Sequence, residues 1–380
     1  MRIGVVTVGR SDYGIYTPVL EAMKSAPALD FYLLVSGMHL SEDFGLTVRD
    51  IETDGFPIGN RIPVLEPGDA PVDIARSIAR GVAGFGAAFS ERRPDMLMVL
   101  GDRFEMYSAA LAALPFNIPV IHIHGGELTQ GAMDDALRHS MTKLSHLHFA
   151  STEEYARRIR QLGEEAWRVT VSGAPSLDNL RTIPLLSVSE LKVRYNLDAE
   201  RSPLLVTFHP ATLETDIAGQ AERFIAALAQ LEMPAVVTMP NSDTHGRIIR
   251  EQFREFAGAR PHIKLIENLG AQGYFSLMSR ASVMVGNSSS GIIEAASFKL
   301  PVVNVGSRQA GRLRPRNVID VDCVSSEIVK AVQLARSDAF RDSLDGLENP
   351  YGDGRASERI VHRLSELELS PAFIKKQFSE

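Results

Sequence analysis

The sequence predicts an α/β protein built on parallel, doubly wound sheets. Short apolar runs rich in valine, isoleucine and leucine recur along the chain, and stretches with helical spacing, such as residues 71–89, separate them. This alternation is typical of parallel strands joined by crossover helices. The pattern restarts at Pro203, and 380 residues exceed what one hydrophobic core usually holds. We therefore expect two Rossmann-like domains that face each other across a cleft.

The expected strands are short and fall into two series. In the first half of the chain they are residues 2–9, 31–36, 95–101, 119–125, 146–151 and 168–173. In the second half they are residues 203–209, 235–241, 262–267, 282–287 and 301–306. A less regular stretch lies between the two series, so the predicted domains are 1–180 and 181–355. The tail, residues 356–380, has a helical pattern and is expected to pack back on the first domain.

The composition excludes several classes of protein. Hydrophobic residues make up 44% and charged residues 23%, which are ordinary globular values. The net charge of -7 argues against a nucleic acid or an anionic membrane as partner, because both require a basic field. Cys323 is the only cysteine, which excludes an intrachain disulfide and a thiolate metal cluster. With no signal-peptide pattern and no run of about 18 apolar residues, we expect a cytoplasmic protein.

The first strand ends in GRSDYG, which places Arg10 at a turn beyond the sheet. Ligands of open parallel sheets bind beyond the carboxyl ends of the strands, so residues at these turns are candidates for binding. GRSDYG matches neither the G-x-G-x-x-G dinucleotide fingerprint nor a Walker A loop, which argues against redox and nucleotide-triphosphatase functions. Arg10 could bind a phosphate with its guanidinium fork, or form a salt bridge at the domain edge.

Acidic residues follow two neighbouring strands and then open a helix. Asp102 comes after the third strand, Glu127 comes after the fourth, and Asp134 and Asp135 stand at the start of the next helix. Taken alone, Asp102 is most simply a helix N-cap. Together, however, acids from successive strand ends are expected to converge in one crevice, which is the arrangement that general acid and base catalysis requires.

Residues 120–149 contain five of the ten histidines. His122 and His124 are two apart on one expected strand, as are His146 and His148 on the next, so each pair should face one side of its strand. With the nearby carboxylates these histidines could bind zinc or iron. Buried histidines that are bonded to backbone groups or carboxylates are the favoured interpretation, and we expect no metal.

On the following helix, Asp135 and His139 are four residues apart, and Arg138 lies beside them. The spacing is that of an ordinary same-face helical pair. It also fits a contact in an active site, so these three side chains are candidate substrate contacts.

The run VMVGNSSSGIIEAASF places small and polar residues at the mouth of a helix, namely Asn287, Ser288, Ser289, Ser290 and Gly291. Backbone amides and hydroxyls at a helix N-terminus bind anions, so a phosphate fits there. Glu294, one turn further, could accept hydrogen bonds from ribose hydroxyls or could simply place a favourable charge near the helix start. His209, at the end of the first strand of this half, faces the expected cleft. Residues 308–316 contain four arginines, which form a solvated loop or send one member, such as Arg312, to a diphosphate.

Seven motifs carry a family resemblance that runs in order along nearly the whole chain. They are GRSDYG, GDRFEM, HIHGGELTQGAMDDALRH, KLSHLHFAS, TFHP, MPNSDTHG and VGNSSSGIIEA. Together they resemble the UDP-N-acetylglucosamine 2-epimerase family, and the HGGE and GNSSSGIIEA forms resemble its hydrolysing branch. The non-hydrolysing branch has a His-x-Glu-Ala-Gly-x-Arg form at the first place and an Asp-Ser-Gly-Gly form at the second. The resemblance implies a GT-B architecture in which the C-terminal domain holds most of the nucleotide.

The resemblance also implies roles for single residues. Asp102, Glu127 and Asp134 match the family's catalytic acids, with Asp135 as the alternative for the third, and His209 matches a histidine of the cleft. The implied nucleotide contacts are Arg10 to a phosphate, Ser289, Ser290 and Gly291 to the diphosphate, Glu294 to the ribose, and Tyr274 with Phe275 to the uracil.

The implied reaction converts UDP-N-acetylglucosamine and water to N-acetylmannosamine and UDP, as in sialic acid biosynthesis, with no cofactor. The alternative is the same chemistry on UDP- or GDP-N,N'-diacetylbacillosamine, in nonulosonic acid biosynthesis, because nothing at the motifs distinguishes the sugars. A GT-B glycosyltransferase would share the serine-glycine loop but would not need three converging carboxylates. A non-catalytic sugar-nucleotide sensor is a further alternative. The family tendency is towards homodimers or homotetramers.

Overall fold

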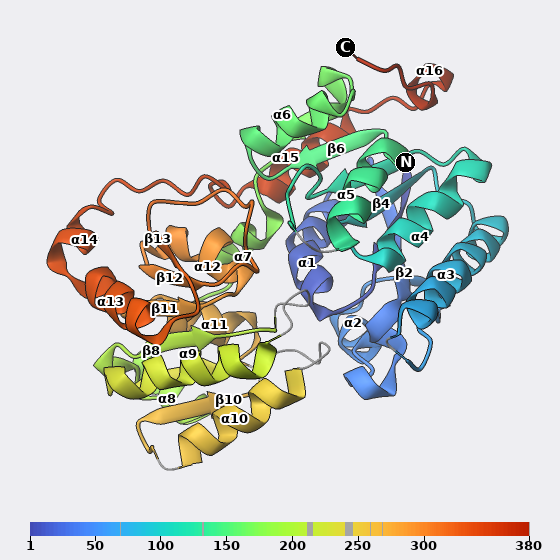
Figure 1. The fold of residues 1–380 in the computed structure, drawn as a ribbon. Helices are drawn as coiled ribbons and strands as arrows, with labels where there is room; N and C mark the ends of the chain where they lie inside the picture. Colours follow the sequence, from blue (N-terminus) through green and yellow to red (C-terminus); the bar gives the residue numbers. More distant parts are fainter. Residues whose placement is uncertain are drawn as a thin grey trace. The chain divides into compact units, whose positions relative to one another are not determined.

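The computed structural model describes residues 1–68, 70–130, 133–210, 216–239, 246–258, 260–267 and 269–379, without the side chains of residues 246 and 247. Residues 240–245, which make up most of the MPNSDTHG motif, lie outside the described residues. The chain folds into two compact units (Figure 1). Unit 1 comprises Met1–Glu127, Met133–Asn179 and Tyr351–Glu380, and unit 2 comprises Leu128–Ala132 and Leu180–Pro350.

The limits of the units differ in three places from the predicted limits of the domains, and at Asn179 the difference is a single residue. Unit 2 ends at Pro350, whereas the sequence placed this limit at 355. Unit 2 also takes in the short segment that begins at Leu128, which the prediction had placed in the first domain. The physical reason is that Leu128 packs closely against a turn of unit 2 that contains Gly311. A Cβ atom added to Gly311 would stand only 2.9 Å from Cβ of Leu128.

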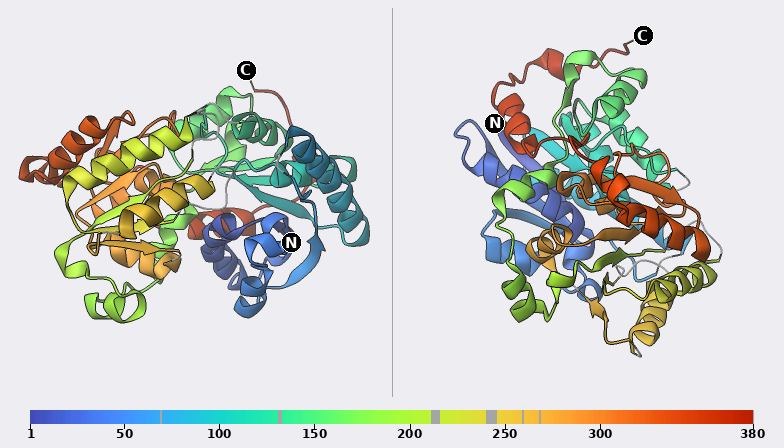
Figure 2. Two further views of the ribbon diagram at one scale, coloured as in Figure 1. Left: turned by 60° about the horizontal axis from the view of Figure 1, so that its bottom comes forward. Right: turned by 90° about the vertical axis from the view of Figure 1, so that its left-hand side faces the viewer.

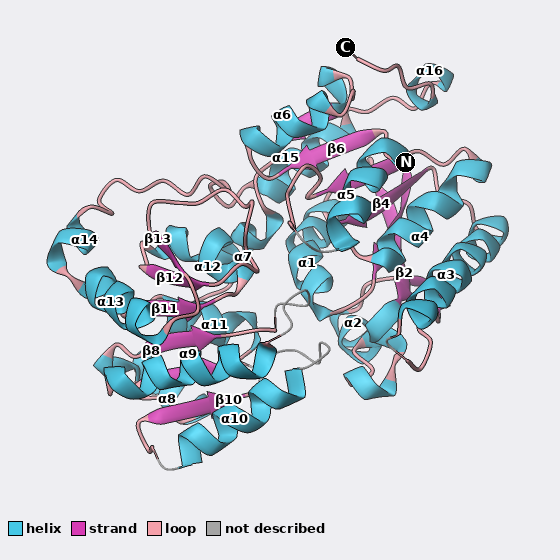
Figure 3. Ribbon diagram, viewed as in Figure 1, coloured by secondary structure: helices cyan, strands magenta, loops and turns pink. Residues whose placement is uncertain are grey.

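A seven-stranded parallel sheet forms the centre of unit 1, in the order β3-β2-β1-β4-β5-β6-β7 (Figure 3). Its strands are β1 Arg2–Thr7, β2 Asp30–Ser36, β3 Ile58–Ile62, β4 Met96–Leu100, β5 Val120–Ile123, β6 Leu147–Ala150 and β7 Val169–Val171. The strand order reverses between β1 and β4. Open α/β sheets bind their ligands at the carboxyl ends of the strands beside such a switch point.

Unit 2 repeats this design with a six-stranded parallel sheet in the order β10-β9-β8-β11-β12-β13. Its strands are β8 Leu204–Thr207, β9 Ala235–Thr238, β10 Ile263–Ile266, β11 Val283–Gly286, β12 Val302–Val305 and β13 Val318–Val321. The switch point of this sheet lies between β8 and β11. The predicted class, two doubly wound Rossmann-like sheets, is therefore confirmed.

Two strands were not predicted from the sequence, and both lie at the edge of a sheet. They are β3, with the sequence IGNRI, and β13, with the sequence VIDV. Most residues of both strands are partly exposed. Buried parallel strands give continuous apolar runs, whereas an edge strand can carry charged and amide side chains, so the apolar signal was absent here.

Helices connect the strands in both units. In unit 1 they are α1 Arg10–Lys24, α2 Val48–Asp54, α3 Pro71–Glu91, α4 Phe104–Ala113, α5 Met133–Leu144, α6 Glu153–Gln161, α15 Ala356–Ser365 and α16 Pro371–Ile374. In unit 2 they are α8 Val188–Tyr195, α9 Ile217–Leu231, α10 Gly246–Gly258, α11 Gly270–Met278, α12 Ser289–Ile293, α13 Ser325–Arg336 and α14 Asp338–Asp342, and α7 Asn179–Thr182 spans the junction. No helix in the described ranges is long and apolar enough to cross a bilayer.

The tail of the chain is less regular than its helical pattern predicted. It forms α15, which ends at Ser365, and the short α16, which begins at Pro371, a residue that suits the first position of a helix. α15 packs against α1, at the opposite end of the sequence (Figure 2). Each unit has a core of its own, in which buried Val, Ile and Leu of the strands face Phe, Met and Ala of the helices.

Candidate active site

The carboxyl edge of the unit 1 sheet brings two of the predicted acids together through an arginine. Arg138, on α5, is 2% exposed and donates from Nη1 to the backbone oxygen of His124 at 2.7 Å. Its Nη2 pairs with the carboxylate of Asp102. Nη1 also lies 4.0 Å from Oε2 of Glu127. Arg138 therefore stands between two carboxylates that come from different strand ends.

Asp102 does not cap a helix, which corrects the simplest interpretation of its position. α4 begins at Phe104, its N-cap residue is Arg103, and no side chain accepts a hydrogen bond at that cap. The carboxylate of Asp102 is 22% exposed, whereas the side chain of Glu127 is 2% exposed. Asp102 thus presents its charge at the sheet edge, with Arg138 as an ion-pair partner.

Glu127 is held by two further side chains. Nδ1 of His124 lies 2.5 Å from Oε1 of Glu127, and the Ser151 hydroxyl donates to the same oxygen at 2.9 Å. These contacts come from the turn after β5 and from the end of β6. They fix the orientation of a carboxylate that is almost fully buried. A fixed orientation of this kind is what proton transfer by a side chain requires.

One histidine of each predicted pair lies outside its strand, so the prediction that each pair shares one face of a strand is wrong. β5 ends at Ile123, and the next residue, His124, has a left-handed backbone with φ of 63°. His146 precedes β6, while His148 lies within it. His124 therefore leaves the face of His122 and turns onto Glu127 instead.

Asp134 and Asp135 open α5 but face different partners. Burial raises the pKa of Asp134, and the negative charge of Asp102 raises it further, so these two carboxyl groups interact. Oδ2 of Asp135 lies 3.6 Å from Nε2 of His139, and burial lowers the pKa of that histidine. Asp135 and His139 thus form the helical pair that their spacing allowed, and Asp134 is the aspartate that shares the surroundings of Asp102.

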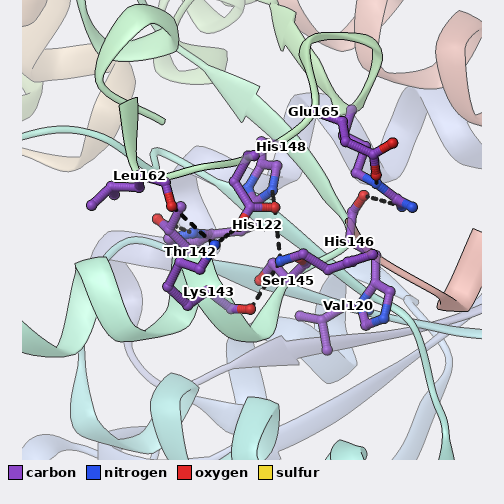
Figure 4. A network of polar contacts seen from close by, with 12 residues as sticks. Val120, His122, Thr142, Lys143, Ser145, His146, His148, Leu162 and Glu165 are labelled. Carbon is purple, nitrogen blue, oxygen red and sulfur yellow. Dashed lines mark hydrogen bonds and ion pairs between the residues drawn. The ribbon is translucent and has the colours of Figure 1, made fainter. Parts of the chain in front are cut away.

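His122 and His148 lie buried on neighbouring strands of the sheet, in a network of polar contacts (Figure 4). Nε2 of His122 lies 2.8 Å from the carbonyl oxygen of Gly101, the residue before Asp102. Burial lowers the pKa of His122 to about 3, so the ring is neutral and Nε2 donates to that carbonyl. His148, its register partner on β6, contacts Glu164 at 3.1 Å. Among the residues that the structure describes, no three His, Cys, Asp or Glu side chains form a group that could hold a metal ion.

The sequence reasoning gave no role to a further charged group at the switch point between β1 and β4. Asp12, on the first turn of α1, is 4% exposed and accepts a hydrogen bond from the Thr7 hydroxyl at 2.6 Å. Arg103 donates from Nε and Nη2 to the fully buried Glu105 at 3.2 and 3.1 Å. The sequence signal that could have found these groups is their position. Asp12 and Arg103 lie within a few residues of the ends of β1 and β4, the two strands between which the strand order reverses.

The switch point of unit 2 brings the TFHP and GNSSSG motifs together. The Asn287 side chain accepts from the backbone N–H of His209 at 2.7 Å and donates to the carbonyl of His209 at 2.8 Å. The backbone oxygen of Asn287 in turn accepts from Arg308 at 3.1 Å and from Gln309 at 2.9 Å. Burial, and then the charge of Arg308, lower the pKa of His209 to about 3. His209 is therefore a neutral imidazole in a fixed backbone position.

The serine turn lies beside Tyr274. Ser288 is the N-cap of α12, and its hydroxyl accepts from the backbone N–H of Ser290 at 3.3 Å. The Tyr274 hydroxyl lies 3.4 Å from Oγ1 of Thr207, at the end of β8. Burial raises the pKa of Tyr274, while hydrogen bonds with Thr207, Ser290 and Ser288 oppose this rise. The hydroxyl groups of this turn and of Tyr274 thus gather at one place.

Two other predicted nucleotide contacts, Phe275 and Arg10, have surroundings that favour a structural role, whereas Glu294 does not lie in the place that its structural alternative required. The ring of Phe275 is 7% exposed and packs in an apolar cluster against Phe298, so it is not open to a stacking base. Glu294 follows α12 as its C-cap, and its charge therefore lies at the end of this helix rather than near its start. Arg10 lies 3.8 Å from Asp50, and both side chains are exposed.

The arginines of residues 308–316 contact different parts of unit 2. Arg314 pairs through Nε with both carboxylate oxygens of Asp320, and its Nη1 donates to the carbonyl of Arg312 at 2.9 Å. Arg316 donates to the carbonyl of Ser343 at 3.3 Å. Arg314 and Arg316 thus hold the loop, and Arg308 is the member that reaches the switch point.

Two doubly wound parallel sheets, each with polar residues at its switch point, define a protein of the GT-B fold class. A family model described as UDP-N-acetylglucosamine 2-epimerase matches residues 21–365. The chain belongs to this family. Its fold is similar to that of the UDP-GlcNAc 2-epimerase from Neisseria meningitidis bound to UDP-GlcNAc, with a TM-score of 0.83, 18% identity, and 96% of this chain and 99% of that chain covered.

Three relatives match the chain over most of its length. The UDP-N,N'-diacetylbacillosamine 2-epimerase (hydrolyzing) of Legionella pneumophila is 38% identical, covering 99% of this chain and 98% of the relative. The GDP/UDP-N,N'-diacetylbacillosamine 2-epimerase (hydrolyzing) of Campylobacter jejuni is 36% identical, covering 90% and 88%. The UDP-N-acetylglucosamine 2-epimerase of Neisseria meningitidis serogroup B is 31% identical, covering 99% and 98%. The predicted family and its hydrolysing branch are thus confirmed.

Proposed function

We propose that this protein is a hydrolysing 2-epimerase that converts UDP-N,N'-diacetylbacillosamine and water to 2,4-diacetamido-2,4,6-trideoxymannose and UDP. The observation that carries this choice of sugar is the order of identity among the relatives, 38% and 36% to the two diacetylbacillosamine enzymes against 31% to the UDP-N-acetylglucosamine enzyme. It reverses the order in which the family resemblance placed the two substrates. UDP-N-acetylglucosamine is the second candidate, because the relative named for it also matches over 99% of this chain.

The reaction begins with removal of the C2 proton as UDP departs. No carbonyl lies beside C2, so direct abstraction at neutral pH would be prohibitive, whereas breaking the anomeric bond makes this proton acidic. A carboxylate takes the proton, the C2–H electron pair forms the C1=C2 double bond, and the C1–O pair leaves with the β-phosphate oxygen of UDP. The glucal-like intermediate is then protonated at C2 on the other face, and water adds at C1.

Asp102, Glu127 and Asp134 share the base and acid roles in this scheme. Arg138 holds Asp102 and Glu127 at one sheet edge, which supports their joint action. The raised pKa of Asp134 suits it to carry the proton that is delivered to C2. In unit 2, the hydroxyl groups of Ser288 and Ser290 bind the diphosphate, and the neutral His209 donates a hydrogen bond to it.

Turnover in heavy water is expected to place one deuterium at C2 of the product, because the C2 proton is taken up by a carboxylate and the proton delivered to C2 comes from a carboxyl group that exchanges with solvent. Proton NMR of the product after reaction with each of UDP-diacetylbacillosamine, GDP-diacetylbacillosamine and UDP-N-acetylglucosamine measures both the substrate and the label. Retention of the C2 proton would contradict the mechanism. Release of UDP only with an added acceptor would indicate a glycosyltransferase, and UDP binding without turnover would indicate a sensor.

Asn287→Asp is expected to weaken UDP binding about tenfold, because the new oxygen would oppose the His209 carbonyl where the amide now donates, and one buried hydrogen bond is worth about 1–1.5 kcal/mol. Calorimetric titration with UDP measures the change. Asn304→Ala is the matched control, since the Asn304 side chain donates to Asp320 within the same sheet and makes no contact with His209. Equal UDP affinity in the wild type and Asn287→Asp would mean that His209, and the Asn287 side chain that holds its backbone, do not belong to the UDP site.

A further inference from the structure

His124 lies beside the candidate acids of unit 1, and one of its two ring nitrogens has no role in the proposed mechanism. Nδ1 lies 2.5 Å from Oε1 of Glu127. Nε2 is buried and has no hydrogen-bond partner among the described residues. Buried polar atoms are usually bonded, so this nitrogen calls for an explanation. One explanation is that it exchanges a proton with a bound substrate.

The backbone of His124 is held in a conformation that residues with a side chain rarely adopt. Its φ of 63° lies in the left-handed region. Its N–H donates to the carbonyl of Phe149 on β6 at 3.1 Å, and its own carbonyl accepts from Nη1 of Arg138 at 2.7 Å. Strained backbones of this kind are concentrated at active sites, where the surrounding structure imposes them. Here the left-handed backbone turns the ring away from the strand and onto Glu127.

The contact with Glu127 determines which ring nitrogen carries the proton. The hydroxyl of Ser151 donates to Oε1 of Glu127 at 2.9 Å, and Nη1 of Arg138 lies 4.0 Å from Oε2. Both oxygens of Glu127 thus face donors, which favours a carboxylate that accepts hydrogen bonds. Nδ1–H of His124 is therefore the donor, and in the neutral ring Nε2 carries the lone pair. A lone pair makes Nε2 a base.

Arg138 connects this base to the other acids of the site. The arginine is 2% exposed, donates to the carbonyl of His124 through Nη1, and pairs through Nη2 with the carboxylate of Asp102. One buried guanidinium group thus holds the backbone of His124 next to two of the three acids of the proposed mechanism. His124 itself is 6% exposed, so its ring is part of the site and not of the solvated surface.

We propose that His124 is a catalytic residue: its Nε2 takes the C2 proton of the substrate, while Glu127 orients the ring and stabilises the imidazolium ion that forms. This inference rests on the proposed function, and it assigns the share of Glu127 in proton transfer to the pair. The C2–H electron pair forms the C1=C2 double bond, and the C1–O pair leaves with UDP. The imidazolium ion later returns its proton to solvent. A carboxylate that orients a histidine base in this way is a recurrent arrangement in enzymes.

His124→Asn tests the inference, because asparagine tolerates the left-handed backbone, which Asn117 and Asn196 adopt elsewhere in the chain. The new amide can replace Nδ1–H as the donor to Glu127, but it supplies no base in place of Nε2. We expect kcat to fall about 10²–10³-fold, with UDP affinity within about threefold of the wild type. The residual turnover should show a larger isotope effect with substrate that carries deuterium at C2, because C2–H cleavage then limits the rate.

His362→Asn is the matched control, since His362 is an exposed histidine of α15 in the same unit, and this variant should keep the wild-type kcat. If His124 only held Glu127 in place, asparagine would hold it as well. A loss of less than about tenfold in kcat of His124→Asn would therefore overturn the inference.

The second readout is the protonation of the His124 ring in nitrogen NMR spectra of the wild type, without substrate, at about pH 8, where an ordinary imidazole is neutral. It does not depend on the folding of a variant. Nδ1 should carry the proton and Nε2 should carry none. A proton on Nε2 would overturn the inference. The expected form of the ring in a protein that turns over none of the three sugar nucleotides would instead refute the proposed function.

Discussion

Glu127→Gln is expected to lower kcat by about 10³-fold, a typical loss when a general acid or base is removed, while UDP affinity stays within about threefold of the wild type. Glutamine keeps the shape of the side chain and can still accept hydrogen bonds from His124 and Ser151. It cannot take up the C2 proton. The loss should therefore fall on the chemical step, and Asp102→Asn should give a loss of similar size for the same reason.

Turnover can be followed by proton NMR of the sugar, and UDP binding by calorimetry. Glu153→Gln is the control, because Glu153 is an exposed residue of α6 in the same unit and forms a surface ion pair with Arg160. It should retain wild-type activity. If Glu127→Gln lost UDP binding or its fold together with its activity, Glu127 would be a structural residue, and the proton transfers would have to be assigned to other groups.

Much of the fold and part of the site could be predicted because parallel sheets follow a simple rule. Continuous apolar runs marked the central strands, and the residues after those runs had to lie at one edge. This rule predicted, from the sequence alone, that Asp102 and Glu127 lie near each other. It did not predict that Arg138 would stand between them, because a contact across two loops depends on how α5 packs and leaves no periodic signal.

Where the sequence reasoning failed, the reason is local geometry. The two-residue spacing of His122 and His124 predicted one shared face, but the chain leaves β5 at Ile123 and His124 adopts a left-handed backbone. Tyr274 and Phe275 are neighbours on α11, so their side chains point about 100° apart around the helix axis. One therefore enters the apolar cluster, and the other meets Thr207.

Glu164→Ala is expected to lower the free energy of unfolding by about 3–5 kcal/mol, the usual cost of removing one partner from a buried ion pair. The Glu164 side chain is fully buried and is surrounded by donors from three parts of the chain. Nζ of Lys143 and Nζ of Lys376 each lie 2.7 Å from its oxygens, and Nε2 of His148 lies 3.1 Å away (Figure 4 shows Lys143 and His148 in this network). Removal of the carboxylate leaves two ammonium groups close together with no counter-charge.

The pH dependence of stability gives a second, independent measure of how much the Glu164 carboxylate contributes to the free energy of unfolding. Burial alone would raise the pKa of Glu164, but the hydrogen bonds from His148, Lys143 and Lys376 bring it down to about 2. A carboxyl group whose pKa is lower in the folded state adds stability above its unfolded pKa of about 4.5, and this stability is lost as the pH falls from there towards 2. The wild type should thus lose about 3 kcal/mol from this group over that range, and Glu164→Ala should lose none of it.

The tail of the chain should respond most strongly to this substitution, because Lys376 joins it to the sheet. Besides its ion pair with Glu164, Nζ of Lys376 donates to the carbonyl oxygens of Lys143 at 2.9 Å and Ser145 at 2.6 Å. Hydrogen exchange should therefore accelerate in residues 371–379 of Glu164→Ala more than in the central strands. Denaturant unfolding of Glu366→Gln, an exposed glutamate paired with His362, should match the wild type within about 0.5 kcal/mol. A loss below about 1 kcal/mol in Glu164→Ala would mean that solvent reaches the two lysines, and that the cluster is not a buried ionic anchor of the tail.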